Sequence, residues 1–531
     1  MGLPSSSLDT NWFMFIIPII PLNNLLLVIL LTLFTIAFLK WTIPKGGIAW
    51  RNKRNQMGQI HIQGPKGLPI FGILFALNHD LPHRTLASIA SALSTTKQLM
   101  AFSLGSTPAV ITSNPSIARE ILNSPHFSNR PIKQSAKSLM FSRAIGFAPN
   151  GTYWRSLRRV ASTHLFSPRR IIAHEAGRRL DCTVMLNSIA YEQSKHGFVC
   201  LRKHLQDAAL NNIMDTVFGS RLYNREQCHI KELHEMVKEG FELLGAFSWS
   251  DFVSWISFFY DPYHIRERCL VLAPRVKKFV KTILDEHRMA TSSKMTSDNS
   301  DFVDVLLSLD GDEKIQDDDI IAILWEMIFR GTDTTALLTE WIMAELILNQ
   351  QIQTKLLEEI NNVVGNKNHV TDADVTKMPY LEAIVKETLR VHPIGPLLSW
   401  ARLSTSDVQL SNGMVVPTNT TTMVNMWAIT HDPNVWADPF VFKPERFMKS
   451  EGGVEVDVRG VDLRLAPFGA GRRVCPGRNL GLVTVSLWVA RLVHKFHWVQ
   501  DMTNPIDLSE VLKLSCEMKY PLKGVAIPRL V

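Results

Sequence analysis

The sequence predicts a mainly α-helical protein with small β-sheets, built as one large domain behind a single N-terminal transmembrane helix. Three observations support this fold class. After Pro115 most of the 531-residue chain has the apolar spacing of helices, and we find no internal repeat. A long uncharged stretch precedes the domain, at residues 12–39. Short alternating segments typical of strands occur near residues 100–104, 109–112, 408–410 and 415–416.

The N-terminal stretch has the length and composition of a membrane anchor. Residues 25–39 are almost purely apolar, and a helix needs about 20 such residues to cross roughly 30 Å of hydrocarbon. Pro18 and Pro21 interrupt the first third, so we predict a transmembrane helix at residues 22–39 within an anchor formed by residues 1–39. A cleaved signal peptide fits less well, because no Lys or Arg precedes the apolar stretch.

Basic residues follow this stretch, and the first acidic residue after it is Asp80. Because positive residues beside a membrane helix stay in the cytosol, we predict a single-pass protein whose body faces the cytosol. Residues 40–72 are expected to form a basic linker that ends in a proline-rich elbow, where the prolines exclude a helix. Residues 73–531 are expected to form the globular domain.

The composition argues against two other classes of protein. The formal net charge is +8, but no basic run interleaved with aromatics supports nucleic-acid binding, and much of the excess lies beside the apolar stretch. The six cysteines are scattered without Cys-x-x-Cys pairs. This spacing argues against a disulfide framework and against a zinc site, and it is typical of a reducing compartment.

The most specific segment is a glycine-rich loop at residues 467–477, Pro-Phe-Gly-Ala-Gly-Arg-Arg-Val-Cys-Pro-Gly. Its glycines allow a tight turn and a close approach to a flat ligand. Cys475 lies just before a predicted helix and beside Arg472 and Arg473, a setting that favours the thiolate over the thiol. A thiolate of this kind can be the axial ligand of a haem iron. The alternative is a small buried cysteine in an ordinary turn.

A long apolar helix is predicted at residues 320–348, behind three aspartates that oppose the helix dipole. Its middle contains the polar run 330–335. A threonine inside a helix can hydrogen-bond back to a carbonyl and loosen the helix locally. The distortion would open a groove for dioxygen and water, where Asp333 and Thr334 could relay protons. The alternative is that these polar groups only cap or bend a structural helix.

Glu387 and Arg390 lie three positions apart on one face of a helix that begins at Pro379 and ends before a His-Pro dipeptide. Alone, an exposed pair of this kind adds only about 0.2–0.5 kcal/mol. A second arginine, Arg446, follows in the sequence Pro-Glu-Arg-Phe, upstream of the cysteine loop.

Together these segments resemble the cytochromes P450. The spacing Phe-x-x-Gly-x-Arg-x-Cys-x-Gly at residues 468–477 matches the haem-binding signature of that family at every fixed position. The anchor, the elbow, Trp-x-x-x-Arg at 154–158, the acid–alcohol helix, Glu-x-x-Arg and Pro-Glu-Arg-Phe also occur in the family's order, so the resemblance spans nearly the whole chain from the elbow onward. Longer runs are similar to the plant microsomal family 78, subfamily A, at residues 329–334, 395–402, 423–429 and 462–469.

The resemblance implies the cytochrome P450 fold, with haem b as cofactor and Cys475 as the axial ligand of its iron. It assigns oxygen activation to Asp333 and Thr334. Trp154, Arg158 and Arg473 would contact the haem propionates, because arginine forks suit carboxylates. Arg402 is a further candidate for such a contact. The cofactor-binding set implied by the motifs is Trp154, Arg158, Phe468, Arg473, Cys475 and Gly477.

The resemblance also implies that Glu387, Arg390 and Arg446 form one buried network that holds the cysteine loop against the haem. Arg330 departs from the family pattern, which places a small residue there. It either pairs with Glu326 or Asp333 on its own helix, the reading we favour, or faces an anionic or carbonyl-bearing substrate. The residues expected to line the substrate site are Phe329, Arg330, Ile394, Leu397 and Leu398.

The implied reaction is a monooxygenation at the endoplasmic reticulum membrane, with electrons from NADPH delivered singly by NADPH–cytochrome P450 reductase. The plant group implies an apolar substrate, for example a fatty-acid-like molecule, and a role in organ or seed growth. One alternative is a haem-thiolate isomerase or dehydratase that needs no reductase. Another is a non-catalytic haem- or lipid-binding membrane protein. The intact Asp333–Thr334 pair favours the monooxygenase.

Overall fold

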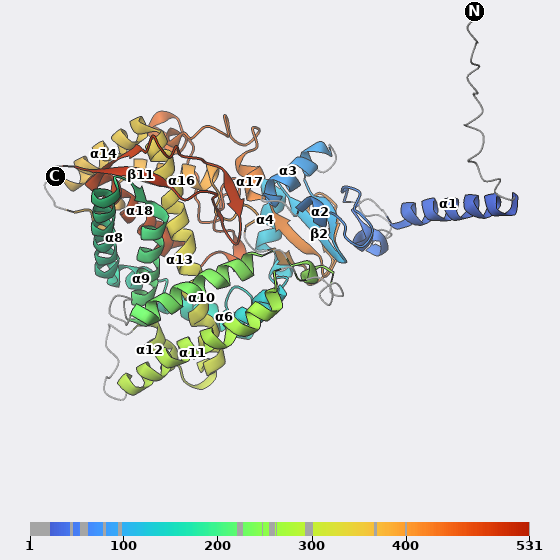
Figure 1. Ribbon diagram of the computed structural model, residues 1–531, viewed down its shortest axis with the longest axis horizontal. Helices are drawn as coiled ribbons and strands as arrows, with labels where there is room; N and C mark the ends of the chain where they lie inside the picture. The colour runs from blue at the N-terminus through green and yellow to red at the C-terminus, as the bar shows by residue number, and fades with distance from the viewer. Residues whose placement is uncertain are drawn as a thin grey trace, which may run out of the picture.

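The computed structural model describes residues 22–42, 46–53, 62–77, 81–93, 98–219, 227–246, 248–253, 261, 263–291, 301–365, 369–398 and 401–529. Helices dominate this part of the chain, and the sheets are small. One sheet lies on the side of the body nearest α1, and another lies at the opposite end beside α8 and α14 (Figure 1). The predicted mainly α-helical class with small sheets is confirmed.

The α-helices in chain order are α1 (Leu22–Thr42), α2 (Leu74–Leu77), α3 (Pro82–Ala92), α4 (Pro115–Asn123), α5 (Gln134–Leu139), α6 (Thr152–His164), α7 (Pro168–Ala173), α8 (Glu175–His196), α9 (Leu201–Phe218), α10 (Gln227–Gly245), α11 (Ile265–Thr291), α12 (Phe302–Leu307), α13 (Asp317–Leu348), α14 (Gln350–Val364), α15 (Asp372–Val375), α16 (Pro379–Val391), α17 (Met426–Thr430) and α18 (Arg478–Lys495).

The strands are β1 (Met100–Leu104), β2 (Thr107–Thr112), β3 (Val199–Cys200), β4 (Arg402–Leu403), β5 (Val408–Gln409), β6 (Val415–Val416), β7 (Thr421–Val424), β8 (Phe496–Gln500), β9 (Glu510–Leu512), β10 (Cys516–Met518) and β11 (Lys523–Pro528).

The four-stranded sheet joins distant parts of the chain in the order β1-β2-β7-β4. β1 and β2 form an antiparallel hairpin, whereas β7 pairs in parallel with β2, with Ala109 opposite Thr421. Parallel strands need a long crossover, and here the crossover contains most of the helices. A second sheet has the order β3-β11-β8 and places Gly524 between Val199 and Gln500.

The described parts of the predicted linker and elbow pack on the four-stranded sheet. Trp50 is buried and donates a hydrogen bond from Nε1 to the carbonyl oxygen of Phe102 (2.8 Å). Gly72 has a φ of +63°, and a Cβ atom there would lie 2.0 Å from the carbonyl oxygen of Ser103. Glycine is required at this close contact, so these segments are held against the body.

α13 runs through the centre of the body (Figure 1). Its first half packs Trp325 and Phe329 into a cluster shared with α9, α10 and α11. Its second half packs Trp341 into another cluster, with Trp488 of α18 and Trp498 of β8. Because the helix is covered by other elements along most of its 32 residues, it needs no continuous polar face. The polar run 330–335 lies between the two apolar clusters.

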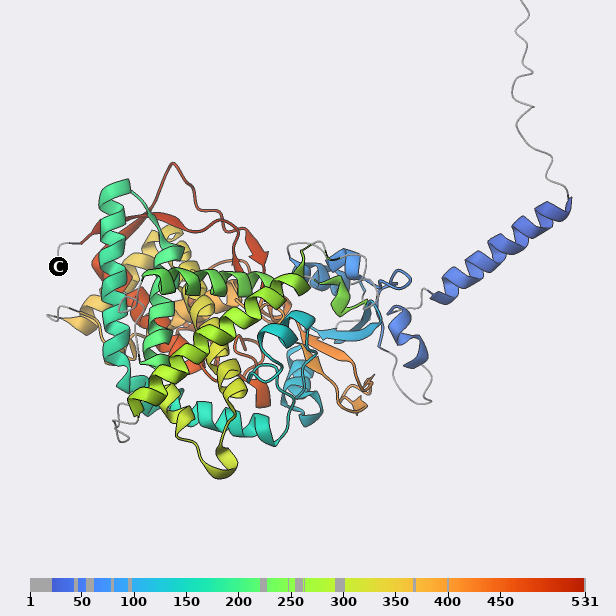
Figure 2. The ribbon, with the colours of Figure 1, turned by 60° about the horizontal axis from the view of Figure 1, so that its bottom comes forward.

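α1 extends away from the body in both views of the ribbon (Figures 1 and 2), and Leu26 and Phe34 are more than half exposed. Among the helices of the described residues, none is both long and apolar enough to cross a membrane. The transmembrane helix at 22–39 therefore stays a prediction. The predicted interfacial part of the anchor before residue 22 lies outside the described residues.

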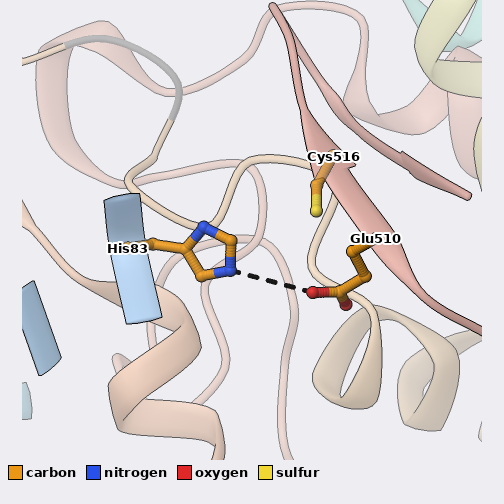
Figure 3. A group of neighbouring side chains, drawn as sticks. All are labelled: His83, Glu510 and Cys516. Atoms are coloured by element: carbon orange, nitrogen blue, oxygen red, sulfur yellow. Dashed lines mark ion pairs between the residues drawn. The ribbon is translucent and has the colours of Figure 1, made fainter. Parts of the chain in front are cut away.

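A buried charged cluster ties the two ends of the domain together (Figure 3). His83 of α3 faces Glu510 of β9 at 3.8 Å, with Cys516 of β10 beside them. Arg84 donates a hydrogen bond to Glu510 Oε2 at 2.6 Å. Burial raises the pKa of Glu510, but contacts with His392 and His83 and the charge of Arg84 outweigh burial and hold this pKa well below its usual range.

Candidate active site

The cysteine loop at residues 467–477 leads directly into α18, whose N-cap is Gly477. The Cys475 N–H donates to the carbonyl oxygen of Phe468 (3.0 Å), which closes the loop. Gly471 has a φ of +66°, and a Cβ atom there would lie 2.1 Å from the carbonyl oxygen of Leu122. Only glycine fits this left-handed position against α4.

A cavity of about 290 Å³ is lined both by this loop and by α13. The structure thereby brings together segments that are far apart in the sequence. The predicted site residues that line the cavity are Trp154, Arg158, Phe329, Arg330, Asp333, Thr334, Ile394, Leu398, Phe468, Arg473, Cys475 and Gly477.

Leu397 does not line this cavity, contrary to its prediction as a substrate contact. It packs against the apolar cluster of the four-stranded sheet that contains Phe102. Its neighbour Leu398 has a φ of +47° and contacts both the cavity and a different cluster. This turn in the backbone directs the two leucines to different sides.

The Cys475 thiol is half-buried in the cavity wall. Burial raises the pKa of this thiol above its usual value, and the Gly477 N–H and the charges of Arg330, Arg158 and Arg478 lower it by less. The prediction that the loop favours the thiolate is therefore wrong for the protein chain by itself, because the loss of water outweighs the nearby positive charge. Coordination to a metal ion removes this proton.

Besides Arg330 of α13, four arginines line the cavity: Arg130, Arg158, Arg402 and Arg473. Burial lowers the pKa of each of them, to about 9 for Arg402 and to about 10 for Arg473. Mutual repulsion lowers these pKa values further. The charge of Arg473 lowers the pKa of Arg130 and Arg402, and the charge of Arg158 lowers the pKa of Arg402 and Arg473. Buried cations held this close are stabilised by an anion, and the two carboxylates of a haem meet that requirement.

The predicted propionate contacts donate to main-chain carbonyl oxygens in this structure. Arg158 donates to Val474 (2.8 Å), and the Trp154 indole donates to Ile145 (2.9 Å). Arg473 donates to the carbonyl oxygens of Ser128 (2.8 Å), Ile145 (3.0 Å) and Ala148 (2.6 Å). The Arg473 bonds hold the segment 128–148 against the cysteine loop. Contact with a haem carboxylate would require some of these donors to exchange partners.

Two glycines leave room beside the cysteine. Gly469 and Gly481 both line the cavity, and a Cβ atom built on either one would meet no atom within 4 Å. Space of this kind next to a cysteine suits a broad, flat ligand. Together with the arginines, it shows that the residues present fit a haem.

On α13, the acid–alcohol pair faces the same cavity. Burial raises the pKa of Asp333 to about 6, although a contact with Ser515 lowers it. Thr334 is exposed to the cavity, and its hydroxyl lies 3.4 Å from the carbonyl oxygen of Arg330. A carboxyl group with this pKa can both hold and release a proton near neutral pH.

Arg330 pairs with Glu326 and not with Asp333. The Arg330 Nε donates to Glu326 Oε1 at 2.8 Å, one turn earlier on α13. The same carboxylate oxygen accepts the Gly146 N–H at 2.9 Å. Both charged residues line the cavity.

Glu387, Arg390 and Arg446 lie together behind the cysteine loop rather than in the cavity. Arg390 donates two hydrogen bonds to the Glu387 carboxylate, both 2.8 Å, and neither side chain is exposed. Arg446 approaches Glu387 Oε1 at 3.3 Å. Arg390 also donates to the carbonyl oxygens of Thr430 and Pro439, so the network fixes the long loop that precedes the cysteine.

Sequence reasoning missed many residues of the cavity, among them Arg130 and Gly481. Arg130 lies in a Ser-Asn-Arg-Pro stretch that has no periodic pattern, and its proximity to Arg473 arises only from the tertiary fold. Gly481 lies in the first turn of α18, where an isolated helical glycine gives a weak signal.

Comparisons with known proteins agree with this geometry. The family model described as "Cytochrome P450" matches residues 62–520. The chain is 64% identical to "Cytochrome P450 78A7" of Arabidopsis thaliana, over 92% of this chain and 91% of that protein. It is 56% identical to "Cytochrome P450 78A11" of Oryza sativa subsp. japonica, over 99% and 98%. It is 33% identical to "Flavonoid 3'-monooxygenase" of Petunia hybrida, over 88% and 92%. The chain therefore belongs to the cytochrome P450 family of haem-thiolate monooxygenases and is similar to its 78A members.

Proposed function

We propose that this enzyme hydroxylates an apolar small molecule, with dioxygen as oxidant and with electrons that reach it from NADPH through a membrane-bound reductase. The observation that carries the proposal is that Cys475 and the Asp333–Thr334 pair line one cavity. A haem-thiolate isomerase or dehydratase does not need the acid–alcohol pair, and a haem- or lipid-binding protein does not need it either.

Cys475 is proposed as the axial ligand of a haem b, and the arginines around the cavity as the partners of its carboxylates. Phe468 and Gly477 line the cavity on either side of Cys475 in the sequence, and we assign both to contact with the cofactor. When bound, the haem supplies the activation of dioxygen. The chain itself supplies the sulfur ligand, the positive wall and the shape of the cavity.

We assign proton transfer to Asp333 and Thr334. With a pKa of about 6, the Asp333 carboxyl can take up a proton from water and release it again near neutral pH. The Thr334 hydroxyl, at the next position of α13 and open to the cavity, can accept that proton and present it to oxygen. Phe329, stacked on Phe241 at 4.0 Å, helps to exclude bulk water from this side.

The substrate is proposed to be apolar, for example fatty-acid-like. Apolar side chains from several segments, such as Ile213, Val217, Phe329, Ile394 and Leu398, line the cavity, and they favour a hydrocarbon surface. The similarity to the plant 78A proteins supports a role in organ or seed growth.

We propose that residues 1–39 anchor the enzyme in the endoplasmic reticulum membrane through a transmembrane helix at 22–39, with the catalytic domain in the cytosol. Residues 40–72 would connect the anchor to the domain at 73–531. Arg472 is exposed beside Cys475, and Arg478 begins α18. Both arginines are placed to meet an acidic surface of the reductase.

The test is the spectrum of the reduced protein with carbon monoxide. The wild type should show the Soret shift typical of thiolate ligation, and Cys475→Ala should lose it. Cys182→Ala is the matched control, because Cys182 is a buried cysteine in the apolar core. A wild-type spectrum typical of histidine ligation would refute the proposed ligand. Product formation without NADPH or reductase would favour the isomerase.

A further inference from the structure

The first half of α13 places an ion pair in the cavity, close to Cys475. Glu326 is 1% exposed, whereas the Arg330 side chain is 35% exposed and lines the cavity. The carboxylate is therefore buried in the wall, and part of the guanidinium group is accessible to a molecule in the cavity. Cys475 lines the same cavity as both residues of the pair.

The pair is held in place from a second segment. The Gly146 N–H donates to Glu326 Oε1 at 2.9 Å. A Cβ atom on Gly146 would lie 2.5 Å from that oxygen and 2.4 Å from Arg330 Nη2, so the backbone of this segment packs directly on both charged groups. Glu326 and Arg330 thus stay together because their surroundings leave little room for either to turn away.

Aromatic side chains border the pair on one side. The Phe147 ring lies 5.6 Å from Arg330 Cζ, and Phe329 beside it stacks on Phe241. Among the described residues, Glu326 Oε2 is a buried oxygen without a hydrogen-bond partner. Burial of an acceptor without a partner is unfavourable unless a donor reaches it. The pair therefore offers a donor and an acceptor to a molecule in the cavity.

The arginines assigned to the haem carboxylates also act on the pair. The charges of Glu326 and Arg330 both shift the pKa of Arg130, and Glu326 raises the pKa of Arg158 and Arg473.

The charge of the pair decides which ligand it suits. Under the proposed function the haem carboxylates neutralise Arg130, Arg158 and Arg473, so in the haem-loaded enzyme these arginines do not attract a second anion. A substrate carboxylate near Arg330 would then lie beside the buried Glu326 carboxylate and be repelled by it, because repulsion between charges is strong where water is excluded. An uncharged hydroxyl or carbonyl group meets no such repulsion. It can accept a hydrogen bond from the guanidinium, and a hydroxyl can also donate to the carboxylate.

We propose that the Glu326–Arg330 pair recognises an uncharged hydroxyl or carbonyl group of an otherwise apolar substrate, close to the carbon that is oxidised. This inference rests on the proposed function, because it places that carbon near Cys475 and the Asp333–Thr334 pair. It assigns the enzyme to oxygen-bearing apolar compounds, and not to substrates whose carboxylate lies at the reacting end.

The experiment compares three eight-carbon probes that differ in one group: 2-octanol, octanoate and octane. Their affinities for the haem-loaded protein are measured by calorimetry and by the spectral change on binding. We expect the wild type to bind 2-octanol more tightly than the other two. Arg330→Met roughly keeps the side-chain size and removes the charge. This variant should bind 2-octanol at least about tenfold more weakly than the wild type does, and its affinity for octane should be nearly unchanged.

Glu326→Gln provides the opposite change. The variant keeps an acceptor for the Gly146 N–H but leaves Arg330 uncompensated, so octanoate should bind at least about tenfold more tightly than it does to the wild type. Arg288→Met is the matched control, since it removes an arginine that pairs with Asp285 and Asp317 on the surface. It should leave all three affinities unchanged. If Glu326→Gln does not fold, the Arg330→Met comparison decides alone.

Three results would overturn the inference. The first is a wild type that prefers octanoate or does not discriminate among the probes. The second is an equal loss of affinity for 2-octanol and octane in Arg330→Met, and the third is loss of bound haem in that variant, which would assign Arg330 to the cofactor. The proposed function is tested by a separate measurement: if it is wrong, the wild type itself lacks the thiolate spectrum. A normal wild-type spectrum with any of these three results refutes only the role of the pair.

Discussion

Asp333 is a carboxyl group in a place that is unfavourable for its charge. It is 8% exposed, and burial raises its pKa to about 6. A carboxyl group whose pKa is higher in the folded state than in the unfolded state binds its proton more tightly when folded. It therefore favours folding at low pH, and this contribution is lost as the pH rises from about 4 to about 6. Under the proposed function, this destabilising group lies where a proton carrier is required.

Replacing Asp333 with Asn should remove the pH-dependent cost. A shift from 3.8 to about 6 corresponds to about 3 kcal/mol at neutral pH. We expect Asp333→Asn to be more stable than the wild type at pH 7, by up to about 3 kcal/mol. The difference should fall below about 1 kcal/mol near pH 4, because the carboxyl of the unfolded wild type then begins to bind its proton as well. Thermal unfolding of both proteins between pH 4 and 7 measures this difference.

The same variant should lose about 10²-fold or more in product formation, because an amide cannot pass on a proton, while its thiolate spectrum stays normal. A constant stability difference at every pH would show that folding does not raise the pKa of Asp333. Undiminished activity would exclude Asp333 as the proton carrier.

At the scale of single residues, motif spacing identified cavity residues that lie together within one short segment. Cys475 and Gly477 belong to one loop, and Asp333 and Thr334 to one turn of helix, so their spacing carries the information. Arg130 belongs to no such local motif. The protonation of Cys475 also could not be predicted from neighbouring arginines, because desolvation depends on the tertiary fold.

At the scale of elements, α16 carries a fully buried ion pair, and its arginine donates to the carbonyl oxygens of Thr430 and Pro439 in the segments before the cysteine loop. Glu387 and Arg390 are 0% exposed and share two hydrogen bonds. A buried pair adds little net stability, but removal of one partner leaves the other charge uncompensated. The pair therefore makes the position of these segments depend on α16.

Arg390→Met should destabilise the domain by about 3–5 kcal/mol, because the buried Glu387 carboxylate loses both of its strongest bonds. Chemical denaturation measures the loss, and haem retention should fall with it. Lys386→Met is the control, since Lys386 pairs with the largely exposed Glu382 on the same helix and should cost less than about 0.5 kcal/mol. Similar losses in both variants would show that any charge removal on α16 is damaging.

Elements with strong local signals could be predicted closely. α16 begins at Pro379 and ends at Val391, because proline favours the first turn of a helix and the His-Pro dipeptide ends it. The aspartates at 317–319 likewise mark the start of α13. The pairing of β2 with β7 could not be predicted, because two short strands so far apart in the chain carry no information about each other's register.

At the scale of the whole molecule, the charges around α1 predict the orientation of the protein in a membrane. In sealed microsomes, protease added from outside should digest the catalytic domain, because the basic residues after the apolar stretch keep that side in the cytosol. Detergent permeabilisation should change the pattern of fragments little. Protection of residues 73–531 until detergent is added would place the domain in the lumen.

The fold class and the order of the functional segments could be predicted because each motif is local and the motifs follow a fixed order. The position of the elbow could not. Gly72 and Trp50 belong to a segment expected to be a linker, yet both make close contacts with β1. Burial of this kind depends on the shape of the sheet surface, which the sequence of the segment does not contain.

The contact between α3 and β9 also affects how the chain is made. A ribosome adds about 5–20 residues per second, so Arg84 is synthesised roughly 20–90 seconds before its partner Glu510. β3 also has to wait for β11, the strand that pairs with it, although for a shorter time. The domain can therefore complete its fold only when nearly all of its residues have been translated. A premature stop codon even close to the 3′ end of the reading frame should yield a chain that cells degrade, rather than a shortened enzyme.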